Sequence, residues 1–178
     1  MTDSKKQAKK LLHDCDRCAR YHSERRTFFD VWNKVILVGI VFLNSGAVAT
    51  ISIDQTNWKW AMGLTLISPL LVAINLVFDL TNKARNHEFL SRRFHALEMS
   101  IDVDEASEEK VREWRKCIYS IYEDEPATYY ALNAICYNDA TQALGYSKKF
   151  TLSVTSGQRR LRHWVKYSAT DFDQPNLA

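Results

Sequence analysis

A pair of cysteines three positions apart, Cys15 and Cys18, is the first spacing in this sequence that suggests chemistry. With His13 and His22 nearby, a Cys-x-x-Cys pair offers ligands for zinc. The pair supplies only two thiolates, and the other two cysteines lie far along the chain without ligand-like spacing. Cys15, Cys18 and His22 also share the apolar face of a predicted helix. We therefore favour packing in a helical core, keep zinc as the alternative, and expect no metal or cofactor.

Three consecutive acids before a proline, Glu123, Asp124 and Glu125 ahead of Pro126, form the second chemical candidate. Clustered carboxylates can bind Mg²⁺ or act as general acids and bases. No second acidic cluster, phosphate-binding loop or nucleophile–base pair accompanies them in the sequence. Proline disfavours a helical residue before it and fits the first turn of a helix. We therefore predict that Asp124 or Glu125 caps a new helix at Pro126, and we expect neither a catalytic residue nor an enzyme.

Polar side chains within two long apolar runs are the third candidate. Asn44 lies at the middle of the first run, Ser68 and Asn75 lie within the second, and Asp79 ends it. Amides in a bilayer core are costly and usually face other helices or water. Two interpretations follow: these residues line a pore, or they form hydrogen bonds between the helices of an oligomer. Since one pair of helices cannot enclose a channel, a pore requires a homo-oligomer.

The two apolar runs are the elements that must position these side chains. Each holds nineteen uncharged residues, at 35–53 and 60–78. At a rise of about 1.5 Å per residue, each run spans about 28 Å, close to the hydrocarbon core of a bilayer. We predict a transmembrane hairpin over 31–80, with spans at about 33–53 and 59–79. A buried hairpin in a soluble core is the alternative, but so short a chain could not bury two helices that are apolar on all sides.

Charge predicts the orientation of the hairpin. Nine Lys or Arg residues precede the first run, whereas the turn at 54–59 carries one. The positive-inside rule therefore places both termini of a multi-pass membrane protein in the cytoplasm and the turn at 54–59 outside. Antiparallel spans put Asn44 at the depth of Ser68, and Lys34 near Asp79 as a candidate ion pair at the cytoplasmic edge. The expected membrane-interface anchors are three tryptophans at the ends of the runs: Trp32, Trp58 and Trp60.

Outside the apolar runs the chain is charged and patterned for helices. Five Gly and three Pro in 178 residues favour an all-α fold. No Gly or Pro interrupts residues 1–38, so a helix at 4–30 should continue into the first span, and the second span should continue to about residue 100. Further helices are expected up to about residue 122, at 126–144 and at 146–167. The first of these has an apolar face of Val111, Trp114, Ile118 and Ile121, and Gly145 should end the second. We thus expect a transmembrane hairpin whose long helices extend into a cytoplasmic bundle, in four segments: a cytoplasmic amphipathic helix (1–30), the hairpin (31–80), a cytoplasmic helical domain (81–167) and a disordered tail (168–178).

The sequence QRRLRHWVKY near the end of the chain mixes basic and aromatic residues. Such a segment can be a solvated helix end, contact anionic lipid headgroups or bind nucleic acid. A net charge of only +3 does not by itself indicate nucleic-acid binding. We favour the solvated helix end and expect no direct contact with nucleic acid.

The arrangement resembles the SLATT family, the SMODS and SLOG-associating two-transmembrane effectors of bacterial conflict systems. The resemblance is carried by the hairpin, by the run 84–97 with His87, and by the Glu-Asp-Glu-Pro turn before the helix at 133–145. It implies a pore-forming or membrane-disrupting effector without catalytic residues. It also implies a partner protein encoded nearby, which is a nucleotide-signal synthase, a sensor or a reverse transcriptase, or the product of that partner.

From these observations we expect an oligomeric effector in the bacterial inner membrane. A signal received by the cytoplasmic helices would open the membrane helices and depolarise the cell in antiphage defence. The alternative is a membrane-anchored scaffold or sensor that recruits a partner enzyme through its cytoplasmic helices. In both cases the lipid bilayer and further copies of the chain are the expected partners.

Overall fold

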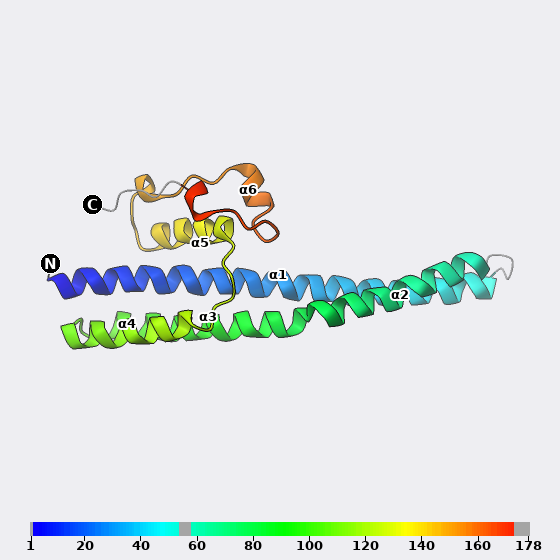
Figure 1. Ribbon diagram of the computed structural model, residues 1–178, viewed down its shortest axis with the longest axis horizontal. Coiled ribbons are helices and arrows are strands. Elements are labelled where there is room, and N and C mark those ends of the chain that lie inside the picture. The colour runs from blue at the N-terminus through cyan, green and yellow to red at the C-terminus, as the bar shows by residue number, and fades with distance from the viewer. Residues whose placement is uncertain (1, 54–57, 173–178) are drawn as a thin grey trace. The chain divides into compact units, whose positions relative to one another are not determined.

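The computed structural model describes residues 2–53 and 58–172 (Figure 1). In this part of the chain every regular element is a helix, which confirms the predicted all-α class. The elements are α1 (Asp3–Ile53), α2 (Trp58–Phe78), α3 (Leu80–Val103), α4 (Glu108–Tyr122), α5 (Tyr130–Ala143), η2 (Lys148–Phe150), α6 (Ser156–Arg160) and η3 (Ala169–Asp171). The chain divides into two compact units: Met1–Arg25 with His87–Ala178, called the core unit, and Arg26–Asn86, called the apolar unit.

Helix α1 is a single element of 51 residues. It contains no proline, and its first glycine is Gly39, so no helix-breaking residue interrupts its first half. The predicted continuation of the N-terminal helix into the first apolar run is therefore confirmed. The division between the two units falls after Arg25, inside this helix.

The sequence predicts that the second apolar run continues as one helix to about residue 100. The structure contradicts this prediction. Helix α2 ends at Phe78 and α3 begins at Leu80, because Asp79 adopts a left-handed conformation with φ of 48°. The backbone stays hydrogen-bonded on both sides, since Asp79 N–H donates to Asn75 O (3.0 Å) and Lys83 N–H donates to Asp79 O (3.1 Å). Aspartate tolerates this conformation better than most residues, so a single residue separates the two helices without a loop.

The apolar unit exposes most of its large side chains. Two of the helices are long and apolar enough to cross a membrane, and only 6% of the apolar window in each is buried. Phe42 on α1 is 73% exposed and Leu76 on α2 is 80% exposed. The alternative of a hairpin buried in a soluble core requires these side chains to be covered. This chain does not cover them.

The core unit is built around the first half of α1. One face of α1 packs against α3 and α4, and α5 lies on the other side of α1 (Figure 1). Burial of each large apolar side chain stabilises such a core by about 1.5–3 kcal/mol relative to exposure. The predicted apolar face of α4 is confirmed, because Val111, Trp114, Ile118 and Ile121 are all buried. The other buried members are Ala8, Leu11, Cys15, Cys18 and Ala19 of α1, and Leu90, Phe94, Leu97 and Ile101 of α3.

Helix α5 ends where the sequence predicts. Gly145 has a φ of 75°, a conformation that glycine adopts at no steric cost. The segment after it contradicts the predicted continuous helix at 146–167, because only the short η2 and α6 within it are helical and residues 151–155 and 161–167 are not. Asn138 of α5 holds this segment: its Nδ2 donates to Leu152 O (2.9 Å), and its Oδ1 accepts from Leu152 N–H (2.6 Å). Both backbone groups of Leu152 are thus satisfied by a side chain, not by a helical turn.

The first part of the predicted disordered tail is ordered. Ser168 and Asp171 form a capping box around η3. Phe172, which is 5% exposed, packs against Ala131 and Ala134 of α5. Leu152, Val154 and Tyr167 pack against the same cluster, so several apolar contacts hold this part of the chain against α5. Residues 173–178 lie outside the described part of the chain.

Candidate functional site

The polar residues of the apolar runs meet across two helices of the same chain. Asn44 of α1 donates from Nδ2 to Ser68 Oγ of α2 (3.0 Å) and to Ile40 O (2.8 Å). Ser68 is buried, whereas Asn44 stays exposed. Equal depth of Asn44 and Ser68 is what an antiparallel pairing predicts. The contact satisfies a polar group that would be costly in hydrocarbon.

A second hydrogen bond joins α1 and α2 at residues that lie farther in sequence from the turn at 54–59. Asn75 of α2 donates from Nδ2 to Asn33 Oδ1 of α1 (3.1 Å). Asn33 was not among the predicted site residues, because it lies before Lys34 and outside the apolar run. Its distance in sequence from the turn is the signal that could have found it, since antiparallel spans bring it near Asn75. Together these two hydrogen bonds join α1 and α2 as antiparallel helices within the apolar unit.

The predicted ion pair between Lys34 and Asp79 does not form in the described part of the chain. Asp79 instead accepts a hydrogen bond from Asn82 Nδ2 (2.7 Å). Lys34 is exposed. The left-handed backbone at Asp79 turns its carboxylate toward the first turn of α3, which the expectation of a continuous helix did not include.

The three tryptophans differ in what the structure describes. Trp32 is 39% exposed and packs edge-on against Phe28, with ring centroids 6.3 Å apart. The side chains of Trp58 and Trp60 lie outside the described residues. Their role as membrane-interface anchors remains a prediction.

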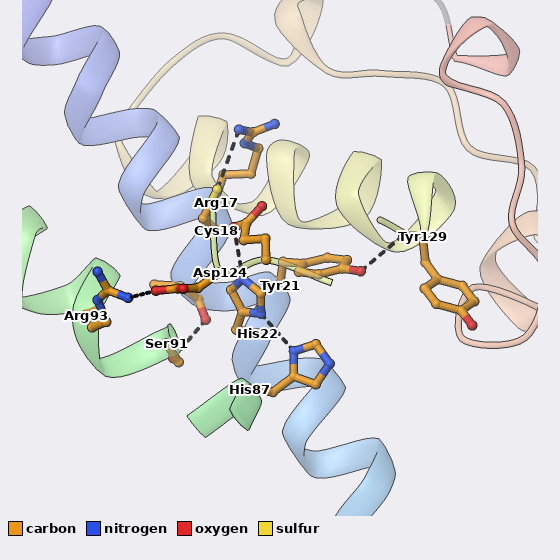
Figure 2. Close-up of polar contacts among 11 residues, drawn as sticks. Arg17, Cys18, Tyr21, His22, His87, Ser91, Arg93, Asp124 and Tyr129 are labelled. Carbon is orange, nitrogen blue, oxygen red and sulfur yellow. Dashed lines mark hydrogen bonds and ion pairs between the residues drawn. The ribbon is translucent and has the colours of Figure 1, made fainter. Parts of the chain in front are cut away.

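Two buried histidines form the most unusual polar contact of the core unit (Figure 2). His22 of α1 is fully buried and His87 of α3 is 4% exposed, and their Nδ1 atoms lie 2.8 Å apart. The other ring nitrogen of His22, Nε2, lies 3.0 Å from Glu125 Oε1, in the turn between α4 and α5. Three segments far apart in sequence therefore meet at His22.

The hydrogen bonds assign the protons of this cluster. A carboxylate oxygen can only accept, so His22 Nε2–H donates to Glu125. In a neutral His22 ring, Nδ1 then has no proton and must accept. His87 satisfies it by donating from its own Nδ1. Adding a proton to His87 leaves this donation in place but puts a charge beside Arg25 in a buried site.

The surroundings oppose that charge. Burial, as the largest cause, acts together with His22 and Arg25 to lower the pKa of His87 to about 3. Phe94 stacks on the His22 ring at 5.6 Å with an interplanar angle of 9°. The result is an uncharged His87 at neutral pH, held in an aromatic, water-poor setting.

The sequence predicts that the acidic turn caps a helix at Pro126, and the structure contradicts this prediction. Helix α5 begins at Tyr130, and its N-terminal cap makes no side-chain hydrogen bond. Asp124 forms an ion pair with Arg93 of α3 (Figure 2), while Glu125 contacts His22. Glu125 is taken from local capping because the buried imidazole of His22 needs a hydrogen-bond partner, and Asp124 is taken by the guanidinium of Arg93.

The cysteine pair packs in the core. Burial raises the pKa of Cys18 to about 11 and raises the pKa of Cys15 still more strongly. Cys18 Sγ accepts a hydrogen bond from Arg17 Nη2 at 3.6 Å. Protonated thiols are poor metal ligands and weak nucleophiles. Among the described residues, no group of three or more His, Cys, Asp or Glu side chains is placed to hold a metal ion.

Comparisons with protein-family models, with curated proteins and with solved structures found no match. The apolar unit offers amide bridges inside an exposed apolar surface. The core unit offers a buried histidine pair that joins α1, α3 and the α4–α5 turn.

Proposed function

We propose that this protein is an oligomeric effector of the bacterial inner membrane, with both termini in the cytoplasm, that depolarises the cell when it is triggered. The observation that carries the proposal is the apolar unit, whose large side chains are exposed while its amides are bridged inside the chain. Such a surface is stable only against lipid tails or other copies of itself. The resemblance to the SLATT family points to the same class, in antiphage defence.

Assembly follows from the number of helices. Two helices enclose no channel, so an ion pathway needs several copies of the chain. Asn44 bridges to Ser68 and is nevertheless exposed, so its amide also faces the outside of its own chain. In an oligomer this face meets either a neighbouring subunit or a water-filled pathway.

Triggering has a route along the chain. The chain passes between the two units at two places, after Arg25 inside α1 and before His87 inside α3. A rearrangement of the core unit must therefore act through these two helices. The His22–His87 contact joins the same two helices, so a partner that separates or rotates them would change the apolar unit directly. A partner protein encoded nearby, or its product, is the proposed source of the signal.

Replacement of the bridging amides tests the proposal. Asn44→Leu combined with Asn75→Leu removes both hydrogen bonds while keeping the side chains similar in size. We expect depolarisation on expression in bacterial cells to fall about tenfold, because a loss of about 1.4 kcal/mol in the open state changes its population by that factor. A potential-sensitive dye measures the effect.

Asn86→Leu is the matched control, since Asn86 is an exposed amide that lies outside the apolar run. It should depolarise cells as the unchanged protein does. Membrane fractions must contain equal amounts of each variant. Unchanged leakage by a well-expressed double variant would contradict the assignment of a pathway to these amides.

A further inference from the structure

A cavity of about 260 Å³ lies in the core unit, between the first turns of α1 and the segment from α5 to η2. Aromatic rings form its walls. His13 packs edge-on against Tyr137, with centroids 4.8 Å apart, and Tyr146 packs edge-on against Phe150, with centroids 6.5 Å apart. His13 Nε2 also lies 3.0 Å from Thr141 Oγ1, which fixes the ring. Each edge-on pair covers one face of one ring, and Lys149 Nζ lies over the Phe150 ring, 4.9 Å from its centroid, so a planar ligand would stack on the remaining ring faces.

Three lysines of α1 border the same cavity: Lys6, Lys9 and Lys10. Lys9 and Lys10 follow Lys6 by three and four positions, so all three extend toward the cavity mouth from one side of the helix. All three are exposed, and in the described part of the chain they form no ion pair. The acid that lines the cavity, Asp14, lies 3.5 Å from Arg17. The cavity mouth thus carries an excess of positive charge that the chain itself does not neutralise.

His13 adds no charge to this site at neutral pH. Burial is the largest influence on it and lowers its pKa below the usual value. The walls therefore present uncharged aromatic surface, while the lysines present the cations. The cavity thus has an apolar aromatic floor, formed by these walls, and a cationic mouth. This arrangement matches a ligand that has a flat ring at one end and an anion at the other.

We propose that this cavity binds a small aromatic phosphate of the nucleoside monophosphate class. The ring of the ligand would stack among Tyr137, Tyr146 and Phe150, and its phosphate would lie between the lysines. Small-molecule pockets usually measure about 300–1,000 Å³, so a cavity of about 260 Å³, which is smaller than this range, limits the ligand to one ring system. Inorganic phosphate alone would leave the aromatic floor uncovered, and an uncharged nucleoside would leave the lysines unpaired.

The proposal does not depend on the membrane function. It concerns a cavity whose lining residues all belong to the core unit, and binding is measured without any leakage assay. Failure of one proposal therefore leaves the other standing.

Calorimetric titration of the full-length protein in detergent micelles tests the site. The four common nucleoside monophosphates are the probes, with adenosine and inorganic phosphate as comparison ligands. We expect at least one monophosphate to bind about tenfold more tightly than adenosine or phosphate, because stacking and charge pairing act together only in that ligand. Its affinity should fall as salt is raised.

Two sets of variants locate the binding. Lys6→Gln combined with Lys9→Gln and Lys10→Gln should weaken monophosphate binding at least about tenfold, and Phe150→Leu should weaken it by a similar factor. Lys5→Gln with Lys116→Gln is the matched control, since both lysines are exposed and neither lines the cavity. The control should bind as the unchanged protein does. Far-UV circular dichroism confirms that each variant is folded.

Three results would overturn the proposal. One is the absence of heat with all four monophosphates at millimolar concentration. Another is equal affinity for inorganic phosphate and for the monophosphates, which would exclude a role for the aromatic floor. The last is binding that survives both sets of variants, which would place the ligand elsewhere.

Discussion

His87 is an uncharged imidazole in a site that resists protonation, and this has a consequence for stability. The pKa of His87 is lowered to about 3 by burial, and the pKa of His163 is lowered to about 4 chiefly by burial as well. In the unfolded chain both rings regain a pKa near 6.5. Below that pH the two histidine rings bind protons in the unfolded state but stay unprotonated in the folded state. The free energy of unfolding must therefore fall as the pH falls from about 6.5 toward 4.

The variant His87→Gln should flatten this dependence. Between about pH 7.5 and pH 5, the contribution of His87 to the free energy of unfolding falls by about 2 kcal/mol, and the variant should lose that part of the slope. Thermal unfolding in detergent micelles, followed by circular dichroism at several pH values, measures it. Lower stability at neutral pH is also expected, since His22 loses a hydrogen-bond partner.

His95→Gln serves as the control for this experiment. His95 lies on the same helix, but its side chain is 57% exposed. Its replacement should keep the part of the pH dependence that comes from His87. A His87→Gln protein that keeps the full acid sensitivity would show that other groups control it.

At the scale of the elements, the break at Asp79 separates α2 from α3 with a single left-handed residue. Asp79→Gly and Asp79→Ala both remove the contact with Asn82, so the difference between them isolates the backbone. Glycine adopts positive φ without a steric penalty, and alanine does not. We expect the Ala variant to be less stable than the Gly variant by about 1 kcal/mol, as measured by thermal unfolding.

Alanine also favours a continuous helix, which gives the same pair of variants a second use. Equal or greater stability of Asp79→Ala would mean that the helix closes over the break at little cost. Asp79→Asn is the matched variant, because asparagine tolerates the left-handed conformation and keeps a polar group for Asn82. It should unfold at nearly the same temperature as the unchanged protein.

At the scale of the whole molecule, the effector and scaffold hypotheses differ in what the apolar helices must do. A chimeric protein distinguishes them: an unrelated two-span hairpin of equal length replaces residues 35–78, and the core unit stays intact. We expect loss of depolarisation in the effector, because its amide bridges and its lipid-facing surface have been removed. The potential-sensitive dye assay, with membrane fractionation as the control for insertion, measures the outcome. Retained cellular activity of the chimera would favour the scaffold.

The sequence predicted the features that depend on neighbouring residues. The absence of Gly and Pro from the first half of α1 predicted a continuous helix, and the periodic Val111, Trp114, Ile118 and Ile121 predicted the buried face of α4. Gly145 predicted the end of α5. These signals act over one or two helical turns, where backbone preference and side-chain period decide the outcome.

The candidate sites were predictable only in part. Counting residues from the turn between two antiparallel spans was enough to pair Asn44 with Ser68. It did not find Asn33, because the apolar pattern had ended before that residue. It also missed the break at Asp79, since aspartate is not a strong helix breaker and no local signal marks its positive φ.

Only the tertiary structure decided the contacts between distant segments. His22 meets His87 across 65 positions and Glu125 across 103, and no local pattern encodes those separations. Glu125 contacts His22 and Asp124 pairs with Arg93, so neither carboxylate caps a helix. Asn138 binds both backbone groups of Leu152, which therefore lies outside a helix. The sequence by itself determined which stretches are helical and which are apolar, because those properties are local. The packing of α1 against α3 and α5 determined which polar groups are buried together, because a buried polar group takes whichever partner the packing brings within reach.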